Sequence, residues 1–411
     1  MSTTETPAHP LEASGAFPAA RRCPFAPPPE YARWRAEPRL PQVVLPSGKR
    51  AWVITRYADA RAVLADPRIS SDARNPGFPG LGAGEQAVAA ELRPFIRMDP
   101  PEHTDVRRML LGEFTVRRSE AREPGIRAVV DEELRRFSTG PRPADLVDGF
   151  AAPVATRLIL RLLGVPGDDT AFFRGVTAVS GGRNSSAEEV GAALREMFGL
   201  LDALVERRTA DPGDDLISRL VTGPFARGEI SRPSLLSQIG ITLNAGHETT
   251  RNMIALSVLT LLEHPDQLAL LRAEPERWPD AVEELLRHLS VADTVPLRVA
   301  TADLEVGGRT VRAGDGVVVP LAAANHDPAS FDRDDVTAGQ FDLRRSPNRH
   351  LAFGFGPHQC LGQHLARVEL RTALRRLVEE LPDLRLARPA ADLPLALNSS
   401  IFGVDELPVT W

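Results

Sequence analysis

The sequence predicts a mainly α-helical protein with a small β-sheet region. Apolar residues recur at helical spacing over most of the chain from Tyr57 onwards, and strand-like alternation is confined to two short stretches. Pro (36) and Gly (31) are plentiful, as many short connections between helices require. The 411 residues, 43% of them hydrophobic, are enough for a large buried core. Because no repeat or low-complexity linker divides residues 1–411, we expect a single domain.

The elements follow in order along the chain. Residues 1–46 hold ten prolines and are expected to form an extended arm that ends in a short strand. Residues 43–45 and 51–55 flank a Pro-Ser-Gly turn signal, which predicts a hairpin. A helical pattern begins at Tyr57, and strand-like alternation returns at 297–320. Further helices are predicted at about 101–120, 125–138, 150–164, 187–208, 231–263, 266–273, 279–289 and 362–381, before a tail broken by prolines.

Composition excludes several classes of function. Lys plus Arg number 49 and Asp plus Glu 55, a net charge of −6 without a basic tail, so we expect no nucleic-acid and no membrane partner. The two cysteines, Cys23 and Cys360, lie far apart, which argues against a disulfide framework and favours a reducing compartment. Residues 1–30 contain no apolar run suited to a signal peptide, and residues 254–262 are too few to span a bilayer. We therefore expect a cytoplasmic protein.

One cysteine lies in an unusual setting. Residues 353–367 read Phe-Gly-Phe-Gly-Pro-His-Gln-Cys-Leu-Gly-Gln-His-Leu-Ala-Arg. The glycines let the backbone turn tightly around the sulfur, and a helical pattern follows at once, so Cys360 is placed near a helix N-terminus that favours a thiolate. With no second cysteine nearby, a Cys-rich zinc or iron–sulfur site is excluded. The thiolate is then a nucleophile, an inert buried thiol or a ligand of haem iron.

The long helix predicted between Ser231 and Pro265 has a polar stretch at its middle. Residues 245–250 read Ala-Gly-His-Glu-Thr-Thr within an otherwise apolar helix. Gly246 costs about 1 kcal/mol relative to Ala inside a helix, so we expect a functional reason for it. The alternative is a bulge in the helix with a solvated Glu248.

The cysteine loop resembles the haem-ligand loop of the cytochromes P450, Phe-Gly-x-Gly-x-His-x-Cys-x-Gly-x-x-Leu-Ala-Arg, at every fixed position. The resemblance implies the cytochrome P450 fold, with haem b between the long central helix and this loop, and Cys360 as the metal ligand. Residues 245–250 resemble the family's oxygen-binding stretch. This implies that Gly246 opens the helix beside O2, and that Glu248 and Thr249 supply protons and hydrogen bonds during oxygen activation.

The resemblance also implies which residues surround the haem. Its two propionates need cationic or hydrogen-bonding partners, and His103 and Arg107 fit the family's His-x-x-x-Arg element. The other implied contacts are Arg298, His358, Phe353, Gly354, Ala245 and Gly362.

A third element is assigned to the scaffold of the haem pocket. Glu284 and Arg287 match the family's Glu-x-x-Arg element, and the segment 341–345 supplies a third partner, for which we favour Arg345 over Arg344. The alternative is an exposed ion pair of little consequence.

The resemblance implies a haem-thiolate monooxygenase of the soluble bacterial type, which uses O2 to hydroxylate or epoxidise a medium-sized, largely apolar small molecule in secondary metabolism. Two alternatives stay open: a P450 that couples C–C or C–N bonds oxidatively, and a catalytically silent haem protein that recruits a partner. The intact Glu248–Thr249 pair argues against the silent protein. By position, substrate contacts fall in residues 74–92, 176–190, 240–249, 291–297 and 399–402, with Asn244, Val295 and Ile401 as candidates and residues 180–186 as a lid. Asn244 has an equal alternative, which is to satisfy helix backbone.

Electrons must reach the site from another protein, because no flavin or iron–sulfur domain is predicted in the chain. We expect NAD(P)H to supply them through a ferredoxin reductase and a ferredoxin. Residues 341–376 carry seven Arg and two acids, a local charge of 7 − 2 = +5 on which an acidic ferredoxin could dock. The alternative is a helix face whose charges are paired elsewhere in the fold. We expect the protein to be a monomer.

Overall fold

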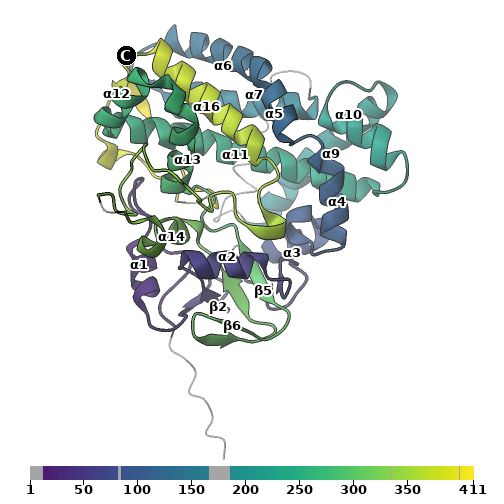
Figure 1. Cartoon of the computed structure of the whole chain (residues 1–411). Helices are drawn as coiled ribbons and strands as arrows, with labels where there is room; N and C mark the ends of the chain where they lie inside the picture. Colours follow the sequence, from purple (N-terminus) through teal and green to yellow (C-terminus); the bar gives the residue numbers. More distant parts are fainter. Residues whose placement is uncertain (1–12, 82–84, 166–185, 334, 398) are drawn as a thin grey trace, which may run out of the picture.

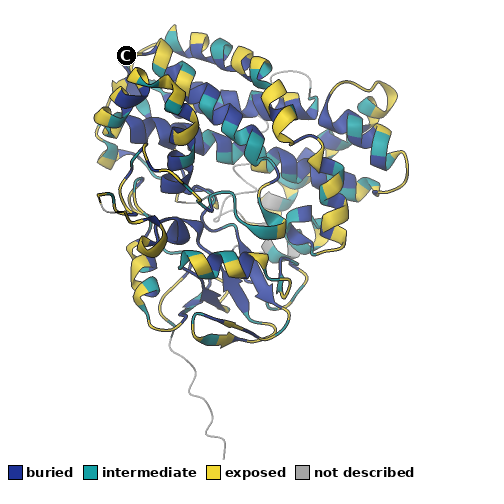
Figure 2. Ribbon diagram, viewed as in Figure 1, coloured by how far each residue is buried: buried dark blue, intermediate teal, exposed yellow. Residues whose placement is uncertain are grey.

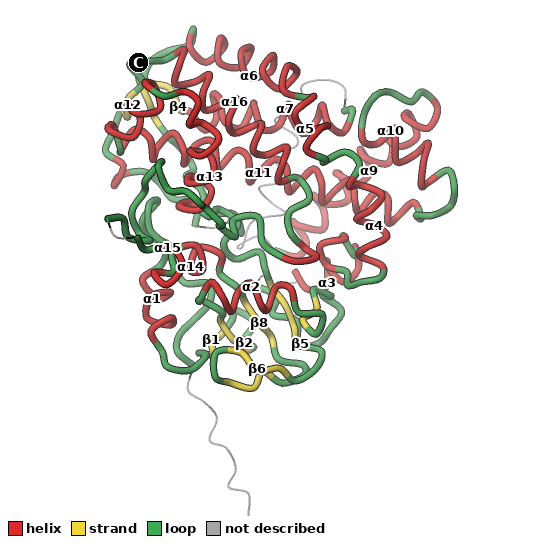
Figure 3. Tube along the Cα trace, in the orientation of Figure 1, coloured by secondary structure: helices red, strands yellow, loops and turns green. Residues whose placement is uncertain are grey.

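The computed structural model describes residues 13–81, 85–165, 186–333, 335–397 and 399–411. A large helical part lies beside a smaller part that contains most of the strands (Figure 1). Figure 3 shows strands at one end of the molecule and a few more near the C-terminus. The predicted class, mainly α with a small sheet region, is confirmed.

The helical part contains most of the helices. These are α3 (Glu85–Leu92), α4 (Glu102–Leu111), α5 (Val116–Ala121), α6 (Glu123–Ser138), α7 (Ala152–Leu163), α9 (Ala187–Ala210), α10 (Leu216–Leu220), α11 (Arg232–Glu263), α12 (Pro265–Ala273), α13 (Trp278–Leu289) and α16 (Gln363–Glu380). Four further helices lie toward the sheet, namely α1 (Pro29–Ala36), α2 (Tyr57–Ala65), α14 (Leu321–Asn325) and α15 (Pro328–Phe331).

The larger sheet has five strands, in the order β1 (Gln42–Val44), β2 (Arg50–Val53), β8 (Gly316–Val318), β5 (Leu297–Ala300) and β3 (Ile69–Ser70). The predicted hairpin is confirmed, because β1 pairs antiparallel with β2 and Val43 lies opposite Ala51. Only β2 and β8 are parallel within this sheet. Successive residues face opposite sides, so Trp52 and Val53 belong to different core clusters. Two smaller sheets are the hairpin β6 (Leu304–Val306) and β7 (Arg309–Val311), and β4 (Ala144–Asp145), β10 (Pro408–Thr410) and β9 (Arg385–Leu386).

The helix α11 runs through the centre of the helical part, where Figure 2 shows mostly buried residues. The Ser231 side chain accepts a hydrogen bond from the Ser234 N–H at its start, and Pro265 follows its end, as the sequence predicted. It packs against α7, α9, α13 and α16. Among the described residues no single helix is long and apolar enough to cross a membrane; α11 and α12 meet that criterion only as a pair bent by 102°.

Three sequence predictions were wrong in detail. The arm over residues 1–46 is not simply extended, because Pro29 begins α1, whose Tyr31 and Trp34 are buried. Residues 101–120 form two helices rather than one, since the Thr115 side chain accepts a hydrogen bond from the Arg118 N–H and starts α5. The tail after α16 contributes two strands, β9 and β10, which pair with each other, and β10 also pairs with β4.

Candidate active site

A tight loop before α16 carries Cys360. Gly354 and Gly356 have φ angles of 70° and 72°, in the region that favours glycine. Gly356 also lies against the end of α2, where an added Cβ would be 2.4 Å from the Leu64 carbonyl oxygen. The Cys360 N–H donates to the Phe353 carbonyl oxygen at 2.8 Å. The backbone therefore closes around the thiol, between the helical part and α2.

Two opposing influences act on the pKa of the Cys360 thiol. Its side chain has accessible surface, yet desolvation by the surrounding protein is the largest influence and raises the pKa. The Gly362 backbone hydrogen bond and the charges of Arg107 and Arg367 lower it by less. The thiolate that the sequence suggested at this helix N-terminus therefore stays a prediction. A cation bound to the sulfur would favour the deprotonated form.

Side chains from two helices hold this loop in place. Arg107 on α4 donates from Nη2 to the Gln359 carbonyl oxygen at 2.6 Å. Arg367 on α16 lies over the Phe353 ring, 4.6 Å from its centroid, and pairs with Glu283 on α13 at 2.7 Å. The structure shows that Arg107 anchors the backbone next to Cys360, and its predicted role as a propionate partner stays a prediction.

The fold brings His103, Arg298 and His358 together although they lie on three separate segments. The His103 and His358 rings contact each other with their centroids 4.1 Å apart and their planes tilted by 39°. Desolvation, the largest cause, and neighbouring arginines lower the pKa of His103 to about 4 and that of His358 to about 2. Desolvation and the charge of Arg97 lower the pKa of Arg298, on β5, to about 9. At neutral pH both imidazole rings are therefore neutral, and the positive charge of the cluster is carried by its arginines.

Arg97 belongs to this cluster and was missed by the sequence analysis. It is buried in a short 3₁₀ turn (Phe95–Arg97), and its guanidinium lies 5.0 Å from the Phe78 ring centroid. Asp99 is the one carboxylate that raises the pKa values of His103 and Arg298. The Asp99 carboxylate oxygens accept hydrogen bonds from the Ser71 N–H at 2.8 Å and from the Ser70 hydroxyl. An arginine between buried apolar residues was the signal that could have revealed Arg97.

The unpartnered atoms of this cluster fit a ligand with two carboxylates. Both ring nitrogens of His103 and Nδ1 of His358 are buried without a hydrogen-bond partner among the described residues. Arg298 donates from Nη1 to the Leu297 carbonyl oxygen, which leaves most of its donors for other acceptors. Two propionates beside a cysteine ligand are what a haem presents, so the residues present fit that group.

The middle of α11 leaves part of its surface uncovered. Ala245 is exposed although its helix is otherwise largely buried. The Thr249 hydroxyl donates to the Ala245 carbonyl oxygen at 2.5 Å. Gly246 faces α7, where an added Cβ would lie 2.6 Å from the Ile159 side chain. Gly246 thus allows close helix packing, and its catalytic role stays a prediction.

Glu248 is held by a residue from the other end of the chain. The Ser399 hydroxyl donates to Glu248 Oε1 at 2.5 Å. Burial, the largest cause, raises the pKa of Glu248, whereas the Ser399 hydrogen bond and the charge of Arg251 lower it. Ser399 was not singled out from the sequence, although it falls in one of the segments expected to contact substrate. No hydrogen bond or ion pair in the described part of the chain joins Glu248 or Thr249 to the Cys360 loop.

Glu284 is buried together with Arg287 and Arg345. Arg287 donates to Glu284 from both Nε and Nη2 at 2.8 Å, and Arg345 Nε lies 3.2 Å from Oε2. Arg344, in contrast, is exposed. Both buried guanidinium groups also donate to backbone carbonyl oxygens between residues 325 and 340. The cluster therefore fixes the segment that leads into the Cys360 loop.

The candidate substrate residues lie on three segments. Val295 and Asn244 are half-buried, and Ile401 is buried. The Asn244 side chain makes no hydrogen bond with the described residues, so the alternative that it satisfies helix backbone is not observed. The predicted lid, 180–186, lies outside the described residues except for Ser186, which caps α9.

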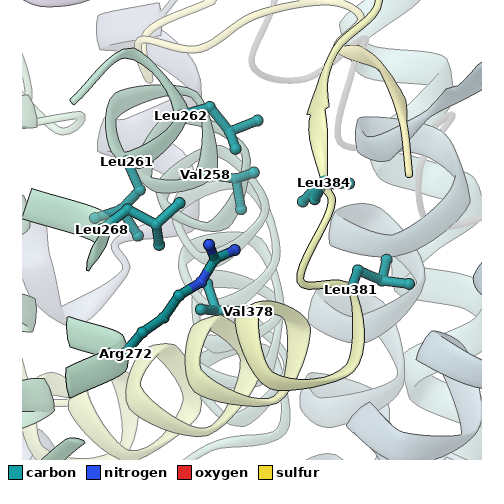
Figure 4. A pocket seen from close by; sticks show the side chains of 8 residues that line it. All are labelled: Val258, Leu261, Leu262, Leu268, Arg272, Val378, Leu381 and Leu384. Atoms are coloured by element: carbon teal, nitrogen blue, oxygen red, sulfur yellow. The ribbon is translucent and has the colours of Figure 1, made fainter. Parts of the chain in front are cut away.

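A cavity of about 10 Å³ lies along α11, past the polar stretch and toward the C-terminal end of the helix. Figure 4 shows the side chains that line it. It is bounded by α11, α12 and the end of α16, and Arg272 reaches toward it. Its volume is enough for about one water molecule, so it does not accommodate a substrate.

Comparison with known proteins identifies the family of this chain. The family model for cytochrome P450 matches residues 279–382. The vitamin D3 dihydroxylase of Streptomyces griseolus is 45% identical over 397 residues, which cover 96% of this chain and 97% of the relative. The crystal structure of CYP105N1 from Streptomyces coelicolor is 53% identical, has a TM-score of 0.88 and covers 97% of this chain and 99% of its own. The structure of the mycinamicin VIII C21 methyl hydroxylase of Micromonospora griseorubida, solved with mycinamicin VIII, has a TM-score of 0.91 and is 40% identical. The match covers 96% of this chain and 100% of that chain. This chain belongs to the cytochrome P450 family.

Proposed function

We propose that the whole chain acts as one haem-thiolate monooxygenase domain, in which Cys360 ligates the iron of haem b. The observation that carries the proposal is the cluster of His103, Arg298 and His358, because its unpartnered ring nitrogens and the remaining N–H groups of Arg298 provide donors for two carboxylates beside a cysteine loop. Arg107 joins this set from α4, and Phe353, Gly354, Ala245 and Gly362 would line the haem.

Thr249 and Glu248 are the two residues of α11 proposed to take part in the reaction. A bound haem with a thiolate ligand activates O2 for insertion of one oxygen atom into a C–H bond or an alkene. Thr249 directs its hydroxyl along the helix in this structure, and a change of side-chain rotamer lets it donate to oxygen instead. Glu248 supplies protons, and the burial that raises its pKa brings it closer to neutral pH, where a proton donor works best.

The substrate is proposed to be a medium-sized, largely apolar small molecule of secondary metabolism. Two relatives of similar identity are named for very different substrates, vitamin D3 and mycinamicin VIII. Both are much larger than the cavity of about 10 Å³ along α11, so we propose that the substrate binds above Ala245, beside Asn244, Val295 and Ile401. Specificity is then set by these segments rather than by the residues shared across the family.

Electrons are proposed to come from NAD(P)H through a ferredoxin reductase and a ferredoxin, with the enzyme a cytoplasmic monomer. The charge argument is weaker than the sequence indicated, because five of the seven arginines in 341–376 form ion pairs with acids. Arg344 and Arg349 are exposed and form no ion pair within the described residues. These two side chains are the proposed contacts for an acidic ferredoxin.

The purified protein tests the proposal through its spectrum. We expect a haem Soret band and a thiolate-type ferrous–CO band, both kept by the control Cys23→Ala, in which an exposed cysteine is removed. Cys360→Ala is expected to lose the thiolate-type band. In an optical titration, ligands that resemble the substrate should shift the Soret band to shorter wavelength. A protein that takes up no haem even after reconstitution would overturn the proposal, and an unchanged CO band in Cys360→Ala would overturn the ligand.

A further inference from the structure

The C-terminal turn around Ser399 is pressed against the polar middle of α11. An added Cβ at Gly403 would lie 2.5 Å from Asn252 Cγ, so glycine is required for this close approach. Asn252 Nδ2 also donates to the Ile401 carbonyl oxygen at 3.3 Å. The turn is thus attached to α11 at points other than Ser399 itself, and a movement of the turn would move Ser399 relative to the helix.

The Ser399 hydroxyl links this turn to Glu248. Its oxygen accepts a hydrogen bond from the Ile401 N–H at 3.0 Å, and its proton is donated to Glu248 Oε1 at 2.5 Å. Because a serine hydroxyl has one proton, this geometry commits that proton to the carboxyl group. A donor directed at a carboxylate stabilises the charged form, which burial alone disfavours. Arg251, one turn further along α11, adds a smaller contribution of the same sign.

Ser400 offers a matched comparison one residue away. Its side chain is exposed, and its hydroxyl makes no hydrogen bond with the described residues. Its carbonyl oxygen accepts a hydrogen bond from Thr294 at 3.3 Å, which does not depend on its side chain. Removal of the Ser400 hydroxyl therefore leaves the turn and Glu248 as they are.

We propose that Ser399 is a positioning residue for Glu248, which holds the carboxyl group in one orientation and links proton delivery on α11 to the turn that carries Ile401. The inference rests on the proposed function, since it takes Glu248 as the proton-delivering acid. A substrate that displaces the turn weakens the Ser399–Glu248 hydrogen bond, which frees the carboxyl group of Glu248 to adopt other orientations. A substrate that leaves the turn in place keeps the carboxyl group oriented for proton delivery.

The first test measures the protonation of Glu248 directly in the ferric holoenzyme without substrate. Its carboxyl infrared band is identified by its loss in Glu248→Gln and followed against pH. In Ser399→Ala we expect the midpoint to rise by about one pH unit, because one charge-assisted hydrogen bond is lost. Ser399→Thr, which keeps the hydroxyl, and Ser400→Ala should keep the wild-type midpoint. A wild-type midpoint in Ser399→Ala would overturn the inference.

The second test follows peroxide released per NADPH consumed, with a surrogate ferredoxin and reductase and no added substrate. The pH profile of the peroxide yield should move in Ser399→Ala by the same amount as the infrared midpoint. Adding Ser399→Ala to Glu248→Gln should change the yield no further. If the two substitutions changed the peroxide yield additively, or if the pH profile did not move with the infrared midpoint, Ser399 would act on a group other than Glu248. Failure of the proposed function can be distinguished from failure of this inference. It would appear in the wild-type protein as absence of haem or absence of haem reduction, independently of the infrared titration.

Discussion

At the scale of single residues, the surroundings of Glu369 on α16 strongly raise the pKa of its carboxyl group. It is buried between α16 and α11, where it accepts a hydrogen bond from the Thr250 hydroxyl at 3.4 Å. Desolvation raises its pKa to about 8, whereas the Thr250 hydrogen bond and the charge of Arg122 oppose that rise by less. The folded protein therefore keeps Glu369 protonated at neutral pH.

This protonation predicts a pH-dependent stability. Glu369 has a folded pKa near 8 and an unfolded pKa near 4.5, so between these values unfolding releases a proton and stability falls as pH rises. We expect Glu369→Gln to remove this loss. Its melting temperature should equal that of the wild type near pH 5 and exceed it by a few degrees at pH 8.5. Differential scanning calorimetry at the two pH values measures this difference.

Glu379, on the same helix, is a suitable control because its pKa is shifted in the opposite direction. Glu379 is exposed and paired with Arg375 and Arg376, which lower its pKa, so Glu379→Gln should bring no gain at pH 8.5. A melting-temperature difference between Glu369→Gln and wild type that stays the same at both pH values would mean that Glu369 is ionised in the folded protein.

The site residues that could be predicted from the sequence are those that belong to a motif with fixed spacing along one segment. Cys360 and the Glu248–Thr249 pair stand in fixed patterns along one segment each, so the printed sequence contains their signal. Arg97 and Ser399 have no such pattern, because their roles come from contacts with segments far away in the chain. Only the fold places them beside the residues that they affect.

At the scale of elements, the buried cluster on α13 determines how the chain reaches the Cys360 loop. Glu284 accepts hydrogen bonds from Arg287, Arg345, the Asn348 side chain and the Asp342 N–H. The two arginines are almost completely buried, so each depends on this carboxylate for charge compensation. Removal of one member of such a cluster leaves uncompensated charge in the interior.

We therefore expect Glu284→Gln to destabilise the protein by about 3–5 kcal/mol, the typical cost of breaking a buried ion pair. The protein should be recovered in low yield and with little haem, because the segment before Cys360 loses its anchor. Denaturant unfolding and the haem-to-protein absorbance ratio measure both effects. Glu276→Gln is the control, since Glu276 is exposed just before α13. A Glu284→Gln variant as stable as this control would contradict the structural role.

Element prediction from sequence succeeded where periodicity was long and failed where pairing was short. The 32 residues of α11 contain several helical turns of apolar residues with a cap at the start, so both ends were located well. The strands β9 and β10 contain two and three residues and exist because Val409 pairs with Leu386 and Ala144. Strands of that length have no periodicity to detect.

At the scale of the whole molecule, ion pairing between distant segments redistributes the charge that the sequence suggests. The excess of +5 over residues 341–376 is reduced because Arg371 pairs with Glu123 on α6 and Arg376 pairs with Asp131. Arg345 is buried with Glu284, so its charge is not accessible to a docking protein. The positive charge available for docking is therefore concentrated on Arg344 and Arg349, in the segment that precedes the Cys360 loop.

This distribution predicts which substitutions weaken electron delivery. Charge reversal in Arg344→Glu and in Arg349→Glu should each raise the KM for an acidic ferredoxin severalfold at low salt, with the Soret and ferrous–CO spectra unchanged. The effect should shrink as ionic strength rises, because salt screens exposed charges. Arg312→Glu is the control: Arg312 is also exposed but follows the β6–β7 hairpin, at the far end of the sheet part (Figure 1). Equal effects of all three variants would show that only net charge matters, and no effect of Arg344→Glu or Arg349→Glu would place the ferredoxin on another face.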